Sequence, residues 1–500
     1  MESRRWLLKA GMALGLSSSV VEQAAAQAPQ VRTRQDVKTF SQDQARVAAL
    51  RAGVAKMKAV SAASPDDPGG WNYWASIHGV TEEPPTSLQP IYAQCDHTWI
   101  TPQQSYIAAH FLSWHRAYLF FFESMLKAAA ASAGAATPFE LPYWNWYVDG
   151  TIPAVFTEGS AATNSLWHDR ASVQLDPTAL KRDFYKQKAL LPSVGGLFAN
   201  SFSVPLEMNP HGAVHGVVGG DMGAVDTSAR DPIFWLHHAN IDRLWTAWTR
   251  FGGGQANPGP NTPWGKSRFK FDVANKMNAT ASAIADSETG LGYRYDNYAI
   301  GPGAVIVAAA PRSIRSVQGL AVVEAPVSAT PGGPARRDLS RTPPIVLRDD
   351  IVAIDLKMAS PARKGLAALA GAAPSSAQGA LVVVRGLKVA PSAKRGGFSY
   401  AVSVALPDQP AREVRLAEIN TFTLSSRGHG AHHGHGAPAG DGVDLELPLK
   451  DALKALGVTS AARLEGGLRV YFRPAQSLGG GPSDPVSVTS VTLVSEGAKP

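Results

Sequence analysis

Histidine placement constrains this chain more than any other feature of its sequence. Thirteen histidines occur among 500 residues, and several lie inside apolar segments that have the periodicity of buried helices. One buried imidazole is usually a structural residue, but several in one domain cost several kcal/mol if they have no polar partners. A shared metal ion would satisfy all of them. The sequence therefore predicts a metal centre inside a helical domain.

Two segments with the pattern of buried helices contain histidines. The segment FLSWHRAYLFFFESMLKAAA begins at Phe111 and is apolar almost all round. The segment DPIFWLHHANIDRLWTAW begins with Asp231 as the expected N-cap and Pro232 in the first turn. The first segment carries His115 and the second carries His237–His238. Both helices are thus expected to place imidazoles in the core.

His211 and His215 have the spacing of two metal ligands on one helix. Residues four apart lie about one turn apart on the same face. Imidazoles without a nearby carboxylate or thiolate cluster favour copper, zinc, nickel or iron and disfavour magnesium or calcium. A zinc protease would need a glutamate directly after the first histidine, and Gly212 stands there instead. The spacing alone leaves the choice among the four metals open.

Tryptophan and strand-forming residues divide the chain into two parts. Eleven of the twelve tryptophans lie between Trp71 and Trp264. Beyond residue 344, Val-rich segments of alternating polarity predict short strands, with one helical segment starting at Leu449. The Ala-, Pro- and Gly-rich stretch between the two parts is typical of a linker. We therefore expect a mainly helical domain over 29–302, a linker over 303–344 and a C-terminal β-sandwich over 345–500.

The first 28 residues resemble a bacterial twin-arginine export signal. Arg4 and Arg5 precede a short apolar stretch, and small residues near Ala26 and Ala28 offer a cleavage site. We therefore expect a protein exported to the periplasm or the medium. No apolar stretch is long enough to span a bilayer.

The positive net charge does not indicate a nucleic-acid partner. The formal charge is +7, and residues 303–500 hold 22 Lys and Arg against 15 Asp and Glu. These charges are dispersed and lack the interleaved aromatic residues that stack on bases. A solvated basic surface accounts for them, so we expect no nucleic-acid binding.

Five motifs in series resemble the tyrosinase and catechol-oxidase family of type-3 copper proteins. They are FLSWHRAYLFFFE from Phe111, PYWNW from Pro142, LEMNPHGAVHGVVGGDMG from Leu206, DPIFWLHHANIDRLW from Asp231, and YRY at 293–295. The resemblance covers about residues 70–300. It implies a four-helix bundle with long irregular loops that holds two copper ions, each bound by three histidines. In longer family members a β-sandwich follows and can cover the active site.

By this resemblance, His78 and His115 bind the first copper, and His97 is the third ligand. His97 follows Cys95 in the Cys-x-His pattern of the family. His110 is the alternative third ligand. In some members the cysteine forms a thioether with the histidine, which would explain the single cysteine of this chain; a plain buried thiol fits the sequence equally well.

The resemblance assigns His211, His215 and His238 to the second copper. His237 is not a ligand in this interpretation, because neighbouring residues of a helix point about 100° apart. Glu207 matches a carboxylate that holds a water near the coppers and acts as the base.

Two more positions bear on the reaction by resemblance. Val225 matches the gate residue over the substrate pocket, and a valine is expected to leave that gate open. Gly212 stands where strong monophenol hydroxylases often have an asparagine, which assists the water held by Glu207. Glycine cannot do so.

These residues predict oxidation of ortho-diphenols (catechols) to ortho-quinones by O2, with weak or absent hydroxylation of monophenols. The partners are then a small phenol and O2. A full tyrosinase with monophenol hydroxylase activity is the alternative, and an oxygen carrier similar to haemocyanin is a further one. The tract from His429 to His435 would suit either copper handling or a flexible loop.

Overall fold

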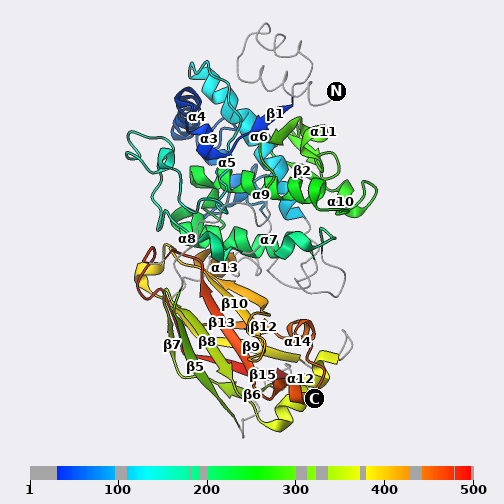
Figure 1. Ribbon diagram of the computed structural model, residues 1–500. Coiled ribbons are helices and arrows are strands. Elements are labelled where there is room, and N and C mark those ends of the chain that lie inside the picture. The colour runs from blue at the N-terminus through cyan, green and yellow to red at the C-terminus, as the bar shows by residue number, and fades with distance from the viewer. Residues whose placement is uncertain are drawn as a thin grey trace.

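The computed structural model describes residues 31–95, 110–180, 183–191, 201–299, 312–322, 336–371, 379–426, 442–477 and 479–496. The predicted export signal, His97 and the tract from His429 to His435 lie outside these ranges. The described chain forms a helical domain followed by a β domain, and the two are in contact (Figure 1). None of the helices within these ranges is both long and apolar enough to cross a bilayer.

Five helices make up most of the helical domain. They are α4 (Gln44–Ala63), α5 (Trp71–His78), α6 (Phe111–Ser132), α8 (Gly212–Val218) and α9 (Pro232–Phe251). The predicted helices at Phe111 and Asp231 are confirmed as α6 and α9. Asp231 caps α9 by accepting a hydrogen bond from the backbone N–H of Ile233 at 2.9 Å.

Short elements connect these helices. The helical ones are α3 (Val37–Phe40), α7 (Ser203–Leu206), α10 (Pro263–Lys266) and α11 (Ser287–Leu291), with single turns at Ala154–Phe156, Pro177–Ala179, Asp183–Lys186, Glu207–His211, Gly220–Gly223 and Ser228–Arg230. The strands β2 (Arg268–Lys270) and β3 (Asn278–Thr280) form a small antiparallel pair.

The strands β1 (Arg32–Arg34) and β4 (Tyr293–Tyr295) pair in parallel and join the two ends of the helical domain. Arg34 reaches from β1 into the core, where it donates a hydrogen bond to Glu123 Oε2 of α6 at 2.8 Å. Both side chains are fully buried. Arg34 also lies over the ring of Tyr293, 3.9 Å from its centre. These contacts tie the first strand to α6 and to the last strand of the domain.

Within the described residues, the β domain contains eleven strands that are connected by hydrogen bonds. The order along the sheet is β11-β10-β13-β8-β5-β6-β15-β9-β14-β7, with β12 beside β9. The strands are β5 (Ile314–Ala321), β6 (Arg336–Arg341), β7 (Ile345–Leu347), β8 (Ile351–Leu356), β9 (Gly379–Val389), β10 (Tyr400–Ala405), β11 (Val414–Ile419), β12 (Val443–Pro448), β13 (Leu468–Pro474), β14 (Val486–Val488) and β15 (Ser490–Glu496).

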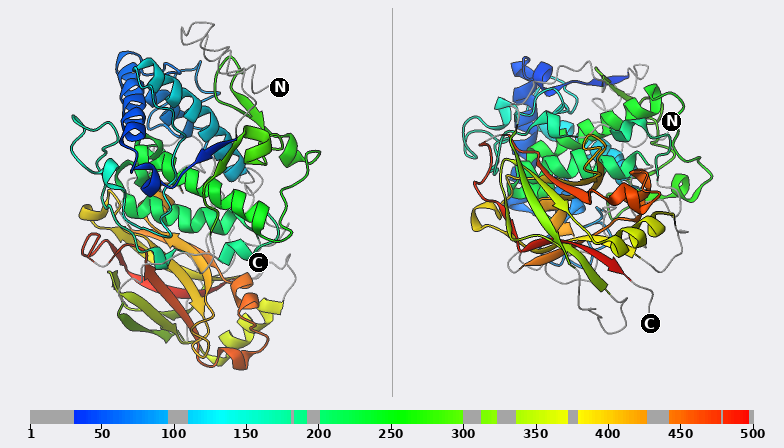
Figure 2. Two further views of the ribbon diagram at one scale, coloured as in Figure 1. Left: turned by 45° about the horizontal axis from the view of Figure 1, so that its top comes forward. Right: turned by 60° about the horizontal axis from the view of Figure 1, so that its bottom comes forward.

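Three helices and two short turns accompany these strands. They are α12 (Ser360–Gly371), α13 (Thr421–Ser426) and α14 (Lys450–Ala455), with turns at Pro391–Ala393 and Ala461–Leu464. The helix α14 confirms the helical segment predicted at Leu449. The helix α13 follows β11 and lies at the end of the β domain that faces the helical domain (Figures 1 and 2).

One prediction about the C-terminal part needs correction. Residues 314–321 and 336–341 belong to β5 and β6, so the linker predicted over 303–344 includes part of the sheet. The strand β5 was missed because large apolar residues such as Ile314 and Leu320 lie exposed among polar ones. The strand β5 pairs with β8 through residues 314–319 and with β6 through residues 320–321, so it connects the strands on either side of it. The β-sandwich stays a prediction.

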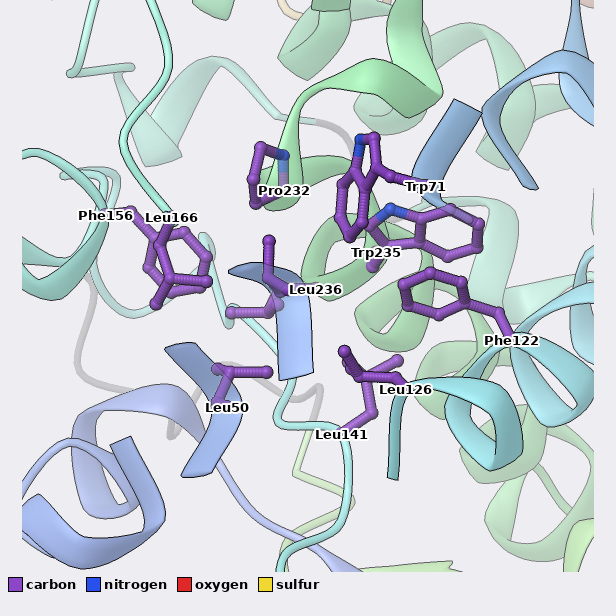
Figure 3. A pocket seen from close by; sticks show the side chains of 11 residues that line it. Leu50, Trp71, Phe122, Leu126, Leu141, Phe156, Leu166, Pro232, Trp235 and Leu236 are labelled. Atoms are coloured by element: carbon purple, nitrogen blue, oxygen red, sulfur yellow. The ribbon is translucent and has the colours of Figure 1, made fainter. Parts of the chain in front are cut away.

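A small cavity lies within the apolar core of the helical domain (Figure 3). Its volume is about 10 Å³, and Trp71, Phe122, Trp235 and Leu236 are among the side chains that line it. A space this small with apolar walls is a packing void that stays dry. It does not have the size of a substrate site.

Candidate metal centre

The first group of potential metal ligands consists of His78, Cys95 and His115. One ligand atom from each lies within 4.8 Å of the others. His78 ends α5, and its Nδ1 donates a hydrogen bond to the carbonyl of Val225 at 2.9 Å. His115 lies on α6, and its Nδ1 donates to the carbonyl of Phe111 at 2.7 Å. A proton on Nδ1 makes Nε2 the metal-binding nitrogen of each ring.

The second group consists of His211, His215, His237 and His238, again within 4.8 Å of one another and fully buried. The Nδ1 atoms of two rings are bound to carbonyls, that of His211 to Glu207 at 3.0 Å and that of His215 to Met222 at 2.8 Å. The Nε2 atoms of His215 and His238 lie 3.4 Å apart. The imidazoles of His211, His215 and His238 thus have ring nitrogens that lie close enough together to bind one metal ion.

His237 lies close to the other three histidines of this group, but its hydrogen bonding does not suit a metal ligand. The indole N–H of Trp146 donates a hydrogen bond to Nδ1 of His237 at 3.0 Å. Because an indole nitrogen can only donate, Nδ1 must be unprotonated, and the neutral ring carries its proton on Nε2. Neither nitrogen then has a lone pair for a metal ion. This tautomer supports the prediction that His238, and not His237, is the third ligand of the second metal.

The two groups adjoin each other. The rings of His115 and His238 are stacked with centres 4.1 Å apart and an angle of 11° between their planes. Phe111 contacts both groups, with its ring centre 4.8 Å from that of His115 and 4.7 Å from that of His211. Two metal ions held here would be neighbours, and a small molecule could bind both.

Burial keeps the imidazoles of His78, His237 and His238 neutral by lowering their pKa values. It lowers the pKa of His78 to about 4 and that of His237 to about 3. Burial also lowers the pKa of His238 well below its ordinary value, and the neighbouring imidazoles add to this shift. Neutral imidazole is the form that binds metal. The donor set of nitrogens with one thiol therefore fits copper, and the residues present match the requirements of a binuclear copper site.

Two residues are candidates for the remaining ligand of the first metal, His97 and His110. His97 lies outside the described residues. His110 precedes α6, and its ring stacks on Trp264 with centres 5.9 Å apart, while its Nδ1 lies 3.1 Å from Ser113 Oγ. It is not part of the group formed by His78, Cys95 and His115. The choice of His97 stays a prediction, and the Sγ of Cys95 lies 3.6 Å from Nε2 of His115.

Of the three other predicted residues, Glu207 and Gly212 lie next to His211 of the second group, and the carbonyl of Val225 contacts His78 of the first group. Glu207 is fully buried one helical turn before His211. Gly212 starts α8, and a Cβ there would lie 3.6 Å from Thr423 Cγ2 of the β domain. Val225 is buried, with 4% of its surface exposed, although the sequence predicted an open gate. The full chain therefore does not expose this position.

Side chains of the β domain reach the second group. Phe422 of α13 stacks on His215 with ring centres 4.0 Å apart and contacts His211 edge to face at 5.6 Å. Asn420 donates a hydrogen bond to the carbonyl of Gly212 at 2.9 Å. The side chain of Asn209 donates to Glu418 at 2.8 Å. Residues 418–423 thus cover the imidazoles from the side of the β domain.

Sequence reasoning expected such a cover but did not find these residues. The segment NTFTL has no composition that distinguishes it from other short helices of the β domain. Its position next to His215 depends on how the two domains dock, which no local pattern encodes.

A fold of buried helices with two adjoining imidazole groups defines a binuclear metal protein of the type-3 copper class. The central part of the chain is similar to known proteins. Residues 68–195 and 195–251 match the model of the common central domain of tyrosinase. Residues 68–251 of the chain are therefore similar to the central domain of the tyrosinase family, in which two copper ions are bound.

Several characterised relatives share this domain. A tyrosinase from Hahella sp. (strain CCB-MM4) is 35% identical over 277 residues, which are 46% of this chain and 57% of that protein. A chloroplastic polyphenol oxidase from Vitis vinifera is 29% identical over 276 residues, 47% of this chain and 43% of that protein. A haemocyanin from Enteroctopus dofleini is 26% identical over 274 residues, 50% of this chain and 20% of that protein. The matches thus span 57% of the relatives' length or less.

Solved structures were compared as well. The structure of latent apple tyrosinase covers 94% of this chain with 98% of its own length, at 17% identity and a TM-score of 0.48. The structure of latent aurone synthase covers 95% of this chain with 90% of its own length, at 17% identity and a TM-score of 0.46.

Proposed function

We propose that this protein oxidises ortho-diphenols to ortho-quinones with O2 and hydroxylates monophenols weakly or not at all. The observation that supports it most is the stacking of His115 on His238 at 4.1 Å, because this contact joins the two imidazole groups into one site. Two diphenols each lose two electrons and two protons, and one O2 accepts all of them to give two waters. When bound, the two copper ions bind O2 and transfer the electrons.

The chain itself has to orient the phenol and accept its protons. In this proposal the phenol ring lies beside His238, below Val225, and both hydroxyls face the space between the two imidazole groups. Glu207 is the base that accepts the hydroxyl protons through a water molecule. It is a buried residue four positions before His211, and its backbone carbonyl accepts a hydrogen bond from Nδ1 of His211 at 3.0 Å.

Gly212 limits the reaction to diphenols in this proposal. A monophenol must first lose a proton from a hydroxyl of high pKa, which requires a well-placed base. Glycine has no side chain that could help Glu207 hold the water. An asparagine at this position would place an amide beside the base.

The β domain keeps the site latent in this proposal. Phe422 lies on His215, and Val225 is 4% exposed, so a phenol cannot reach the imidazoles while the domains remain docked as in the full chain. Release of α13 from α8 is then the activating step.

Catechol turnover by copper-loaded protein tests the proposal. Metal analysis should give two copper ions per chain, and hydrogen peroxide should produce the intense near-ultraviolet absorption band of a type-3 copper pair. Catechol oxidation should then exceed hydroxylation of the matching monophenol under the same conditions. Comparable rates on both, without a lag, would support the full tyrosinase. The absorption band without any turnover, even after limited proteolysis, would support an oxygen carrier.

A further inference from the structure

One loop of the helical domain contacts a ligand of each metal group. This bridging loop, residues 219–228, connects α8 to α9. Its Met222 carbonyl accepts the Nδ1–H of His215 at 2.8 Å, and its Val225 carbonyl accepts the Nδ1–H of His78 at 2.9 Å. Such hydrogen bonds set the tautomer and orientation of a metal-binding imidazole. A shift of the loop would therefore alter both metal groups together.

The bridging loop is held from the β domain by a turn at residues 395–397. The backbone N–H of Gly220 donates a hydrogen bond to the carbonyl of Arg395 at 2.5 Å. Two residues after Arg395, the N–H of Gly397 donates to the carbonyl of Gly216 in α8 at 3.0 Å. Both bonds connect backbone to backbone across the domain boundary. They therefore fix the position of the loop more closely than a pair of side chains would.

The approach at this boundary is close enough to require glycines. A Cβ on Gly396 would lie 2.6 Å from the Cα of Gly219, and a Cβ on Gly219 would lie 2.3 Å from the carbonyl oxygen of Arg395. On the adjoining face of α8, a Cβ on Gly216 would lie 2.3 Å from the Cβ of Asn420. The two backbones fit together only without side chains at these positions.

A second contact holds the bridging loop from within the helical domain. Nε2 of His168 lies 2.8 Å from Oδ2 of Asp221, and both side chains are partly exposed. The carbonyl of Asp221 accepts a hydrogen bond from Thr227 Oγ1 at 2.8 Å, which closes the loop on itself. His168 thus supports the loop from within the helical domain, but a partly exposed pair of this kind contributes little free energy.

We infer that the turn at 395–397 is a positioning element for the copper ligands His78 and His215, and that the β domain therefore helps to retain copper in addition to covering the site. Its backbone holds the bridging loop, and the carbonyls of the loop orient the two imidazoles. This role is separate from that of Phe422, which touches the imidazole rings directly. The inference rests on copper binding by the two groups and not on the proposed catechol oxidation.

The test compares copper retention in three variants of the copper-loaded full chain. Gly396→Ala places a Cβ against the bridging loop at a residue with φ of +93°. Gly457→Ala is the matched control, because Gly457 has φ of +71° in the same domain and its Cβ would meet nothing closer than 3.8 Å. Phe422→Ala removes the cover and leaves the turn unchanged. The readouts are the rate of copper loss to a chelator and the near-ultraviolet band with hydrogen peroxide.

We expect the Gly396 variant to lose copper about 10-fold faster than the Gly457 variant, with a weaker absorption band. The Phe422 variant should retain copper as the unchanged protein does. Equal copper loss from the Gly396 and Gly457 variants would overturn the inference. Faster loss from the Phe422 variant, equal to that of the Gly396 variant, would also overturn it, since covering alone would then explain retention.

A second pair of variants decides the question if Gly396→Ala fails to fold. Gly216→Ala favours the helix α8 but collides with Asn420, so it should loosen the β domain and accelerate copper loss. Adding Asn420→Gly removes the colliding atoms and should restore retention. If the double variant loses copper as fast as Gly216→Ala alone, the effect comes from a change beside His215, and the inference is wrong.

Discussion

Phe422 of the β domain lies flat on His215 of the helical domain, with ring centres 4.0 Å apart and an angle of 18° between the planes. The side chain is fully buried. One contact thus connects a residue far along the chain to a predicted ligand of the second copper. Substitution of Phe422 alone can therefore test whether the β domain covers the site.

Replacing Phe422 by alanine should raise catechol oxidation by the full chain. The ring contact and its packing contribute about 1.5 kcal/mol, so its loss should increase kcat/KM roughly 10-fold. Steady-state oxidation of a catechol measures the change. Phe422→Leu keeps most of the volume and should stay close to the unchanged protein. A Phe422→Ala variant as slow as the original would mean that another contact closes the site.

Introducing an asparagine at Gly212 should shift the balance toward monophenols. The expected gain depends on access, because Thr423 would lie 3.6 Å from the new Cβ. We therefore expect Gly212→Asn to raise the ratio of monophenol to diphenol rates several-fold when combined with Phe422→Ala. The two rates are measured in parallel on one preparation. Gly212→Ala adds a Cβ without an amide and should leave the ratio unchanged.

His238 and His237 should differ in copper content. His238→Gln should reduce bound copper from two ions to one, because it removes a ligand of the second site. His237→Gln should retain both ions, because a glutamine oxygen can still accept the hydrogen bond from Trp146. Metal analysis after dialysis gives the count. Loss of one ion from the His237 variant would show that this ring binds metal after all.

Ionisation of Glu123 should contribute to the free energy of unfolding of the helical domain and make it depend on pH in acid. Burial alone would raise its pKa, but Arg34, followed by Arg32 and Lys127, holds the pKa at about 2. In the unfolded chain the pKa is about 4.3. The folded state thus favours the charged carboxylate. This stabilisation is complete above about pH 4.3 and is lost as the pH falls toward 2.

Glu123→Gln should lower the free energy of unfolding at neutral pH by about 3–5 kcal/mol, because it removes the closer of the two carboxylates that pair with buried Arg34. It should also flatten the dependence of this free energy on pH between about 4.3 and 2. Denaturant unfolding of the copper-free chain at several pH values measures both effects. Glu140→Gln is the control: Glu140 is partly exposed and pairs with Lys127, so its loss should cost less.

Much of the helical domain could be predicted because its sequence patterns are local. The helices at Phe111 and Asp231 follow from periodicity and capping, and they carry His115 and His238. His211 and His215 are recognised by their spacing of four residues. The contacts of Phe422 and of the turn at 395–397 could not be predicted, since they depend on the docking of two domains. The tautomer of His237 follows from Trp146, about 90 residues earlier in the chain, so no helical pattern contains it.

The pairing of Arg32–Arg34 with Tyr293–Tyr295 sets an order of assembly for the molecule. A ribosome delivers the first of these strands roughly 260 residues before its neighbour, so the domain cannot finish its core during the first half of synthesis. Copper captured by the nascent polypeptide would therefore sit in an incomplete enclosure until both ends of the domain have met.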